Sequence, residues 1–70
     1  MSELVIVLDV GTHKICTVIG DVRENDIFVV GVGIEPSMGM KKGVVNDIVA
    51  LSSAISASVH KAEKSSGYEV

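Results

Sequence analysis

The sequence has few of the residues that usually stabilise a very small fold. Cysteine occurs once, at Cys16, so the 70 residues cannot form a disulfide framework. No group of histidine and cysteine has the spacing of a metal site, so the sequence predicts no structural metal either. Because Cys16 lies inside an alternating apolar segment, we interpret it as a small buried side chain without a chemical role.

Positive charge and aromatic residues are also scarce. Six Lys and Arg residues stand against nine Asp and Glu residues, which gives a formal net charge of −3, and there is one Phe, one Tyr and no Trp. Nucleic-acid-binding domains need a basic surface and commonly use stacking aromatics. We therefore expect no nucleic-acid partner.

Long apolar runs are absent too. The chain starts with Met1, Ser2 and Glu3 and has no basic leader before its first apolar run. Asp9 interrupts that run well before the ~20 residues that a membrane-spanning helix needs. We therefore predict a cytoplasmic, soluble protein.

The length limits how much structure the chain can build. With 70 residues, of which 47% are hydrophobic, one small core is available. A chain of this size buries only about 60% of its unfolded surface, so its stability is marginal. We expect a single partial domain over residues 1–70, with no second domain.

Apolar and β-branched runs predict three strands. The first run, residues 4–8, is continuous, which is typical of a strand buried on both faces. The other two runs cover residues 14–20 and 27–34. Gly31 and Gly33 interrupt the third run and predict a bulge, a bend or a close approach of another backbone.

Turn-forming residues separate these strands. Residues 10–13 form the first turn, where Gly11 can adopt a positive φ. The charged and amide residues of 21–26 favour a solvent-exposed second turn. Residues 35–43 contain the single proline and two more glycines, and we expect an ordered loop there without regular structure.

A helix follows the loop. Asn46 is a good N-cap and Asp47 suits the first turn, while Gly67 provides a C-cap. Apolar residues recur at spacings of three and four along a helix of about five turns, and we expect them to cover one face of the sheet: Ile48, Leu51, Ile55, Val59 and Ala62. Residues 68–70 resemble the start of a further strand. The predicted fold is α/β, a three-stranded meander plus one helix.

The most informative stretch for function is the first turn. Gly11 allows backbone N–H groups to approach a phosphate closely, and the hydroxyl of Thr12 can add a hydrogen bond. The backbone N–H of His13 can contribute as well, and Lys14 can neutralise charge. Asp9 suits Mg²⁺, usually through water, or the orientation of an attacking water. These residue types together indicate a polyphosphate site.

Other interpretations of this turn are available from the residues alone. Asp, Gly and Thr are also ordinary hairpin residues, so the turn can be purely structural. A P-loop is excluded, since no Gly-Lys-Ser/Thr enters a helix, and a dinucleotide fingerprint is excluded because the turn joins two strands. We interpret His60, Lys41 and Lys42 as solvent-facing, although the two lysines could reach a partner or nucleotide.

With its strand, Asp9-x-Gly11-Thr12-x-Lys14 turn and second strand, the chain resembles the first subdomain of the actin-like superfamily. Residues 5–20 and the pair Gly31-Val32-Gly33 are similar to the FtsA family of bacterial cell-division ATPases. The pattern Pro36-Ser37-x-Gly39-Met40-x-Lys42-Gly43-x-Val45-x-Asp47 is the more selective part of this resemblance. Together these segments cover nearly the whole chain.

This resemblance implies the opening part of an actin-like (ribonuclease H-like) ATPase subdomain that uses ATP and Mg²⁺. Asp9, Gly11, Thr12 and Lys14 match the first phosphate motif, with Asp9 at the metal and His13 at the variable position. For the full-length family it implies self-association, an FtsZ-like filament partner and a location at the inner face of the cell membrane. Membrane contact would come through a segment absent from this sequence.

The family's other nucleotide-binding segments also lie outside this sequence. We therefore expect weak ATP binding, at millimolar affinity or weaker, and no catalytic residue that acts in this chain alone. Two alternatives stay open. One is a related pilus-assembly or sugar-kinase-like ATPase, which residues 37–47 match poorly. The other is a stand-alone interaction module that pairs its open sheet edge with a partner.

Overall fold

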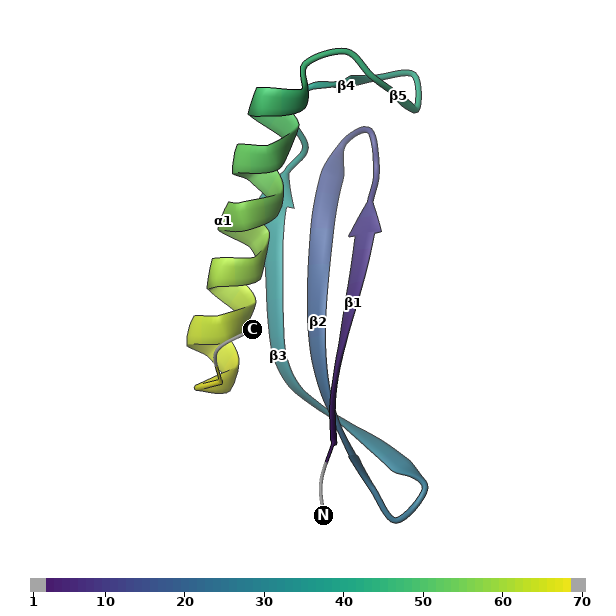
Figure 1. The fold of residues 1–70 in the computed structure, drawn as a ribbon, viewed down its shortest axis with the longest axis vertical. Coiled ribbons are helices and arrows are strands. Elements are labelled where there is room, and N and C mark those ends of the chain that lie inside the picture. The colour runs from purple at the N-terminus through teal and green to yellow at the C-terminus, as the bar shows by residue number, and fades with distance from the viewer. Residues whose placement is uncertain (1–2, 69–70) are drawn as a thin grey trace.

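The computed structural model describes residues 3–68, which form an antiparallel meander with one helix packed against it (Figure 1). The sheet has the order β1-β2-β3, and a separate two-stranded hairpin, β4-β5, precedes the helix. The elements are β1 (Glu3–Val10), β2 (Lys14–Arg23), β3 (Asp26–Pro36), β4 (Met40–Lys41), β5 (Val44–Val45) and α1 (Ile48–Ser66). The predicted three strands and helix are confirmed.

The first strand is not buried on both faces, and that prediction was wrong. β1 lies at the edge of the sheet and pairs only with β2 among the described residues. The helix packs on β2 and β3 and leaves β1 uncovered, as Figure 1 shows. Val7 is consequently 57% exposed, and Leu4, Ile6 and Leu8 are exposed as well.

The second turn is shorter than predicted. β2 continues to Arg23, and only Glu24 and Asn25 form the turn, both with positive φ of 49° and 69°. Two such residues form a type I′ hairpin, whose twist matches that of the flanking strands. Asp21 is therefore a strand residue, 1% exposed, rather than part of a solvent-exposed turn. The Arg23 guanidinium lies 2.8 Å from Asp21 Oδ2, and this hydrogen-bonded partner raises the pKa of Arg23 above its ordinary value.

The predicted irregularity of the third strand is confirmed. Ile19 pairs with Gly31 and Gly20 pairs with Val29, so Val30 is an extra residue in β3 and forms a bulge. Gly31 and Gly33 also allow the helix to approach closely. A Cβ on Gly31 would lie 2.5 Å from the carbonyl oxygen of Ala62. The two glycines thus make a shallow seat for the helix.

This seat determines which face of α1 is buried. The predicted stripe began at Ile48, but Ile48 is 65% exposed. The buried helix residues are instead mostly small: Leu51, Ala54, Ser58 and Ala62. Small side chains let the helix backbone reach the glycines of β3, so close packing overrides the larger apolar residues. Of the predicted stripe, Leu51 and Ala62 are buried.

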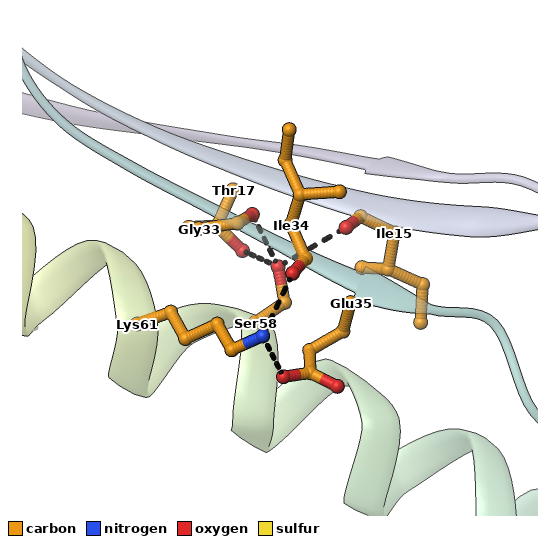
Figure 2. Close-up of polar contacts among 7 residues, drawn as sticks. All are labelled: Ile15, Thr17, Gly33, Ile34, Glu35, Ser58 and Lys61. Carbon is orange, nitrogen blue, oxygen red and sulfur yellow. Dashed lines mark hydrogen bonds and ion pairs between the residues drawn. The ribbon is translucent and has the colours of Figure 1, made fainter.

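A polar cluster fixes the helix on the sheet (Figure 2). Ser58 Oγ lies 2.8 Å from Thr17 Oγ1 and 2.8 Å from the carbonyl oxygen of Gly33. Because Ser58 has a single hydroxyl proton, it donates to Gly33 while Thr17 donates to Ser58. At the rim, Lys61 Nζ lies 2.6 Å from Glu35 Oε1 and donates to the carbonyl oxygen of Ile34.

The helix begins one residue later than predicted. Asp47, rather than Asn46, is the N-cap, and its Oδ1 accepts a hydrogen bond from the N–H of Ala50. The reason is that the N–H groups of both Asn46 and Asp47 donate to the carbonyl oxygen of Gly39, which keeps this stretch out of the helix. The predicted C-cap, Gly67, is confirmed, with φ of 79°.

The loop before the helix contains regular structure. Residues 35–43, predicted to have none, include the end of β3 and the β4 strand, so the prediction of an irregular loop was wrong. Of the strand predicted at residues 68–70, Tyr68 is irregular and residues 69–70 lie outside the described residues. Within residues 3–68 no helix is both long and apolar enough to cross a membrane.

Candidate phosphate-binding turn

The first turn is a tight connection between β1 and β2. The N–H of Gly11 donates to the carbonyl oxygen of Lys14 at 3.0 Å, which leaves Thr12 and His13 at the tip. The positive φ expected for Gly11 is wrong, since Gly11 is not among the residues with positive φ. A Cβ on Gly11 would instead lie 3.1 Å from the Lys14 carbonyl oxygen, so glycine here relieves crowding.

The structure joins this turn to the segment that carries the more selective sequence pattern. Thr12 Oγ1 accepts a hydrogen bond from the N–H of Gly43 at 3.0 Å, although 31 residues separate them. The N–H of Ser37 donates to the carbonyl oxygen of His13 at 3.0 Å. In Figure 1, the β4–β5 hairpin lies above the turn at the same end of the molecule. The two motifs therefore lie side by side and together form one candidate site.

Hydrogen-bond donors dominate the tip of the turn. In the described part of the chain, the N–H groups of Thr12 and His13 make no backbone hydrogen bond. Thr12 Oγ1 accepts a hydrogen bond from Gly43, and its hydroxyl can still donate one. His13 and Lys14 are exposed. Such a set of donors is suited to an anion.

Asp9 and Lys14, two charged residues of the predicted site, flank the tip. Asp9 on β1 pairs with Cys16 on β2. Lys14 is also on β2, two residues before Cys16. Alternation along the strands places Asp9, Cys16 and Lys14 on one face, opposite the buried Ile15. Asp9 and Lys14 are exposed, so the sheet offers both a carboxylate and an ammonium group beside the turn.

A magnesium ligand set is not preassembled in this region. Among residues 3–68, no group of three or more His, Cys, Asp or Glu side chains converges on a point where a metal could bind. Mg²⁺ in nucleotide sites typically takes one or two carboxylates and completes its shell with phosphate oxygens and waters. The chemistry of Asp9 fits this role as a single carboxylate.

Other residues considered from the sequence lie away from the turn or play structural parts. His60 is 68% exposed on the helix, 3.9 Å from Glu63. Cys16 is partly buried and has a free thiol. Lys42 is exposed, as predicted, but it forms the tip of the β4–β5 hairpin with Gly43. The sequence did not identify this hairpin, because its two strands have only two residues each.

Comparisons with known proteins identify the relatives of this chain. No family model matches it. The cell division protein FtsA of Borreliella burgdorferi is 46% identical over 69 residues, which cover 97% of this chain and 17% of that protein. FtsA of Buchnera aphidicola subsp. Schizaphis graminum is 42% identical over 87% of this chain and 15% of its own length. FtsA of Pseudomonas aeruginosa is 33% identical over 99% of this chain and 17% of its own length.

These matches show that the chain is similar to bacterial cell division proteins. It is FtsA-like over nearly its whole length, and the FtsA resemblance inferred from the residues is confirmed. The chain spans about a sixth of the length of these relatives.

Proposed function

We propose that this chain provides the phosphate-binding turn of an FtsA-like, ATP-binding protein. The observation that carries the proposal is the hydrogen bond from the Gly43 N–H to Thr12 Oγ1. It brings together the Asp9–Lys14 turn and the Pro36–Asp47 segment, the two stretches on which the actin-like and FtsA resemblances depend.

The turn would hold the terminal phosphates of the nucleotide through four donor groups. The backbone N–H groups of Thr12 and His13 would approach phosphate oxygens, and the Thr12 hydroxyl would donate its proton. Lys14 would add positive charge from the adjoining strand. Backbone N–H groups in a turn form an anion-binding concavity of this kind, and charged donors strengthen it.

Asp9 would serve the metal rather than the phosphate. A carboxylate next to phosphate oxygens is repelled by their charge, whereas Mg²⁺ attracts both. When bound, Mg²⁺ would neutralise charge on the phosphates. Asp9 would hold it through water and orient it at the edge of the turn.

This chain supplies only one wall of a nucleotide site. A few hydrogen bonds from one turn are opposed by an association cost of at least about 4 kcal/mol, so we propose millimolar affinity or weaker and no turnover. The full role, an actin-like ATPase domain that links division filaments to the inner face of the membrane, would require the partners and segments that the resemblance implies.

The proposal is tested by adding Mg-ATP to the isotopically labelled chain and following backbone amides by NMR. We expect shifts at Gly11, Thr12, His13 and Gly43, and no shifts at Ala62 on the helix. Adenosine, which lacks phosphates, is the matched control and should leave the turn amides unchanged. Equal shifts with ATP and adenosine, or none with ATP in a folded sample, would contradict phosphate recognition by this turn.

A second candidate function is a module that binds partners at the edge of its sheet. The two edges of the sheet differ. On β3, the N–H of Val32 donates to Ser65 Oγ, and the carbonyl oxygen of Ile34 accepts from Lys61. Side chains of the helix therefore cover the outer edge of β3. On β1, residues 4–8 are uncharged and exposed apart from the partly buried Val5. A strand of a partner could add there without displacing a side chain. Protection of the β1 amides from hydrogen exchange on partner binding would support this function.

A further inference from the structure

The tip of the β4–β5 hairpin has an unusual residue for its backbone conformation. Lys41 pairs with Val44, so Lys42 and Gly43 form a two-residue turn. Their φ angles are 52° and 77°, the left-handed pair that defines a type I′ turn. This conformation favours Gly, Asn or Asp, and a residue such as lysine adopts it at a cost in free energy.

Nothing in the packing of the hairpin requires a lysine at this position. Lys42 is exposed. A Cβ at the neighbouring Gly43 would meet no atom within 4 Å, so side chains at this tip are not packed. Residues held in sparsely populated backbone conformations cluster at functional sites, so Lys42 is a candidate for such a site.

The position of the tip indicates what that function is. The peptide group between Lys42 and Gly43 supplies the N–H that lies 3.0 Å from Thr12 Oγ1. The side chain of Lys42 therefore starts beside the candidate phosphate-binding turn, and its flexible four-carbon stem can bring the ammonium group to a ligand there. The left-handed backbone holds this peptide against Thr12.

The charged residues around the turn would not neutralise a bound polyphosphate without a further cation. Asp47 is occupied as the helix cap, and Glu35 is paired with Lys61. Asp9 is the carboxylate assigned to the metal, and Lys14 is the cation already assigned to the phosphates. A triphosphate together with Asp9 carries more negative charge than Lys14 and one Mg²⁺ neutralise.

We propose that Lys42 is a further phosphate-binding residue, which the strained tip of the β4–β5 hairpin delivers to the turn. This inference rests on the proposed function and extends it to a second segment of the chain. The ligand class is a polyphosphate, such as the terminal phosphates of a nucleoside triphosphate. Lys42 acts by direct charge-assisted hydrogen bonds, while Gly43 positions the Thr12 hydroxyl.

The test uses inorganic tripolyphosphate with Mg²⁺ as the probe and compares Lys42→Asn with wild type. Asparagine tolerates the left-handed conformation, so the variant should unfold at the same or a higher temperature. Its affinity for tripolyphosphate, followed through the amides of Thr12 and His13, should fall about two- to fivefold, the range of an exposed charge contact. A purely structural lysine would not lower affinity while leaving stability intact.

Two control variants separate the loss of the Lys42 contact from two simpler effects, the loss of a nearby charge and the relief of a left-handed backbone. Lys41→Gln removes the adjacent charge at a residue with ordinary backbone geometry, and it should weaken binding less than Lys42→Asn does. Glu24→Asn relieves the matching left-handed residue in the β2–β3 turn, where φ is 49°. It should leave tripolyphosphate affinity unchanged.

The remaining outcomes distinguish a failure of the Lys42 role from a failure of the proposed function. Binding by Lys42→Asn equal to wild type, or equal losses in Lys42→Asn and Lys41→Gln, would overturn the role of Lys42 while leaving the proposed function in place. No response of the wild-type turn to tripolyphosphate or to Mg-ATP would overturn both. A wild-type spectrum without dispersed turn amides would also overturn the role, because the hairpin that delivers Lys42 would then not form.

Discussion

Replacing Gly33 with alanine should destabilise the fold more than any other single methyl addition on the sheet. The new Cβ would lie 2.6 Å from the backbone nitrogen of Ala62 and 2.9 Å from Lys61 Cβ, and it would overlap the carbonyl oxygen of Ser58. Ordinary carbon contacts need about 3.5–4.0 Å, so the helix would have to recede by about 1 Å. Overpacking of this kind costs about 1–3 kcal/mol.

The same displacement would break a hydrogen bond. Ser58 Oγ lies 2.8 Å from the carbonyl oxygen of Gly33, and a shift of about 1 Å would remove this bond at a further cost of about 1 kcal/mol. We therefore expect Gly33→Ala to lower the free energy of unfolding by about 2–4 kcal/mol. A chain of this length has a total of only about 4–10 kcal/mol, so the loss is a large part of its stability.

Urea unfolding followed by circular dichroism measures this loss, with Gly43→Ala as the matched control. A Cβ on Gly43 would meet nothing within 4 Å, so its cost comes from the positive φ alone and should be about 1 kcal/mol. If Gly33→Ala costs no more than Gly43→Ala, then the close seat of α1 on β3 is incorrect.

Three further predictions follow from the helix and the site. Asp47→Ala should cost about 1 kcal/mol by thermal unfolding because it removes the helix cap, whereas Asn46→Ala should cost less than half as much; the reverse order would restore Asn46 as the cap. Leu51→Ala should cost about 2–5 kcal/mol and the exposed Ile48→Ala less than about 0.5 kcal/mol, and similar losses would contradict the assigned buried face. Asp9→Ala should abolish the magnesium dependence of ATP binding without moving the thermal transition, and an unchanged magnesium dependence would refute the metal role of this carboxylate.

The strands and helix could be predicted because their signals are local. Runs of β-branched residues and spacings of three and four identify such elements without any tertiary information. The burial of those elements could not be predicted in the same way. The continuous run at residues 4–8 indicated a buried strand, yet β1 is an edge strand in the described structure, because burial depends on which elements cover a strand.

The buried face of the helix was predicted only in part, for a related reason. Hydrophobicity favoured Ile48, which is exposed, whereas the glycines at positions 31 and 33 favour small side chains that allow the helix to approach closely. Ser58 is buried because Thr17 and the Gly33 carbonyl satisfy its hydroxyl, which a hydrophobic pattern cannot indicate.

The candidate site was predicted in part. The residue types of the Asp9–Lys14 turn suit phosphate chemistry but also an ordinary hairpin, and the structure keeps them at one end of the β1–β2 hairpin. The contact between Thr12 and Gly43 joins residues far apart in the chain, so only tertiary structure could reveal it. The left-handed conformation of Lys42 was likewise hidden, since lysine is not a typical residue of type I′ turns.

The most direct test of the central claim is the affinity for Mg-ATP of two variants at position 12. Thr12→Ser keeps the hydroxyl that accepts from Gly43 and would donate to phosphate, so it should bind Mg-ATP within about twofold of wild type. Thr12→Val keeps the shape without the hydroxyl, so it should lose about fivefold or more, consistent with about 1 kcal/mol for one hydrogen bond. Equal affinities for the serine and valine variants would contradict a phosphate-binding role for this turn.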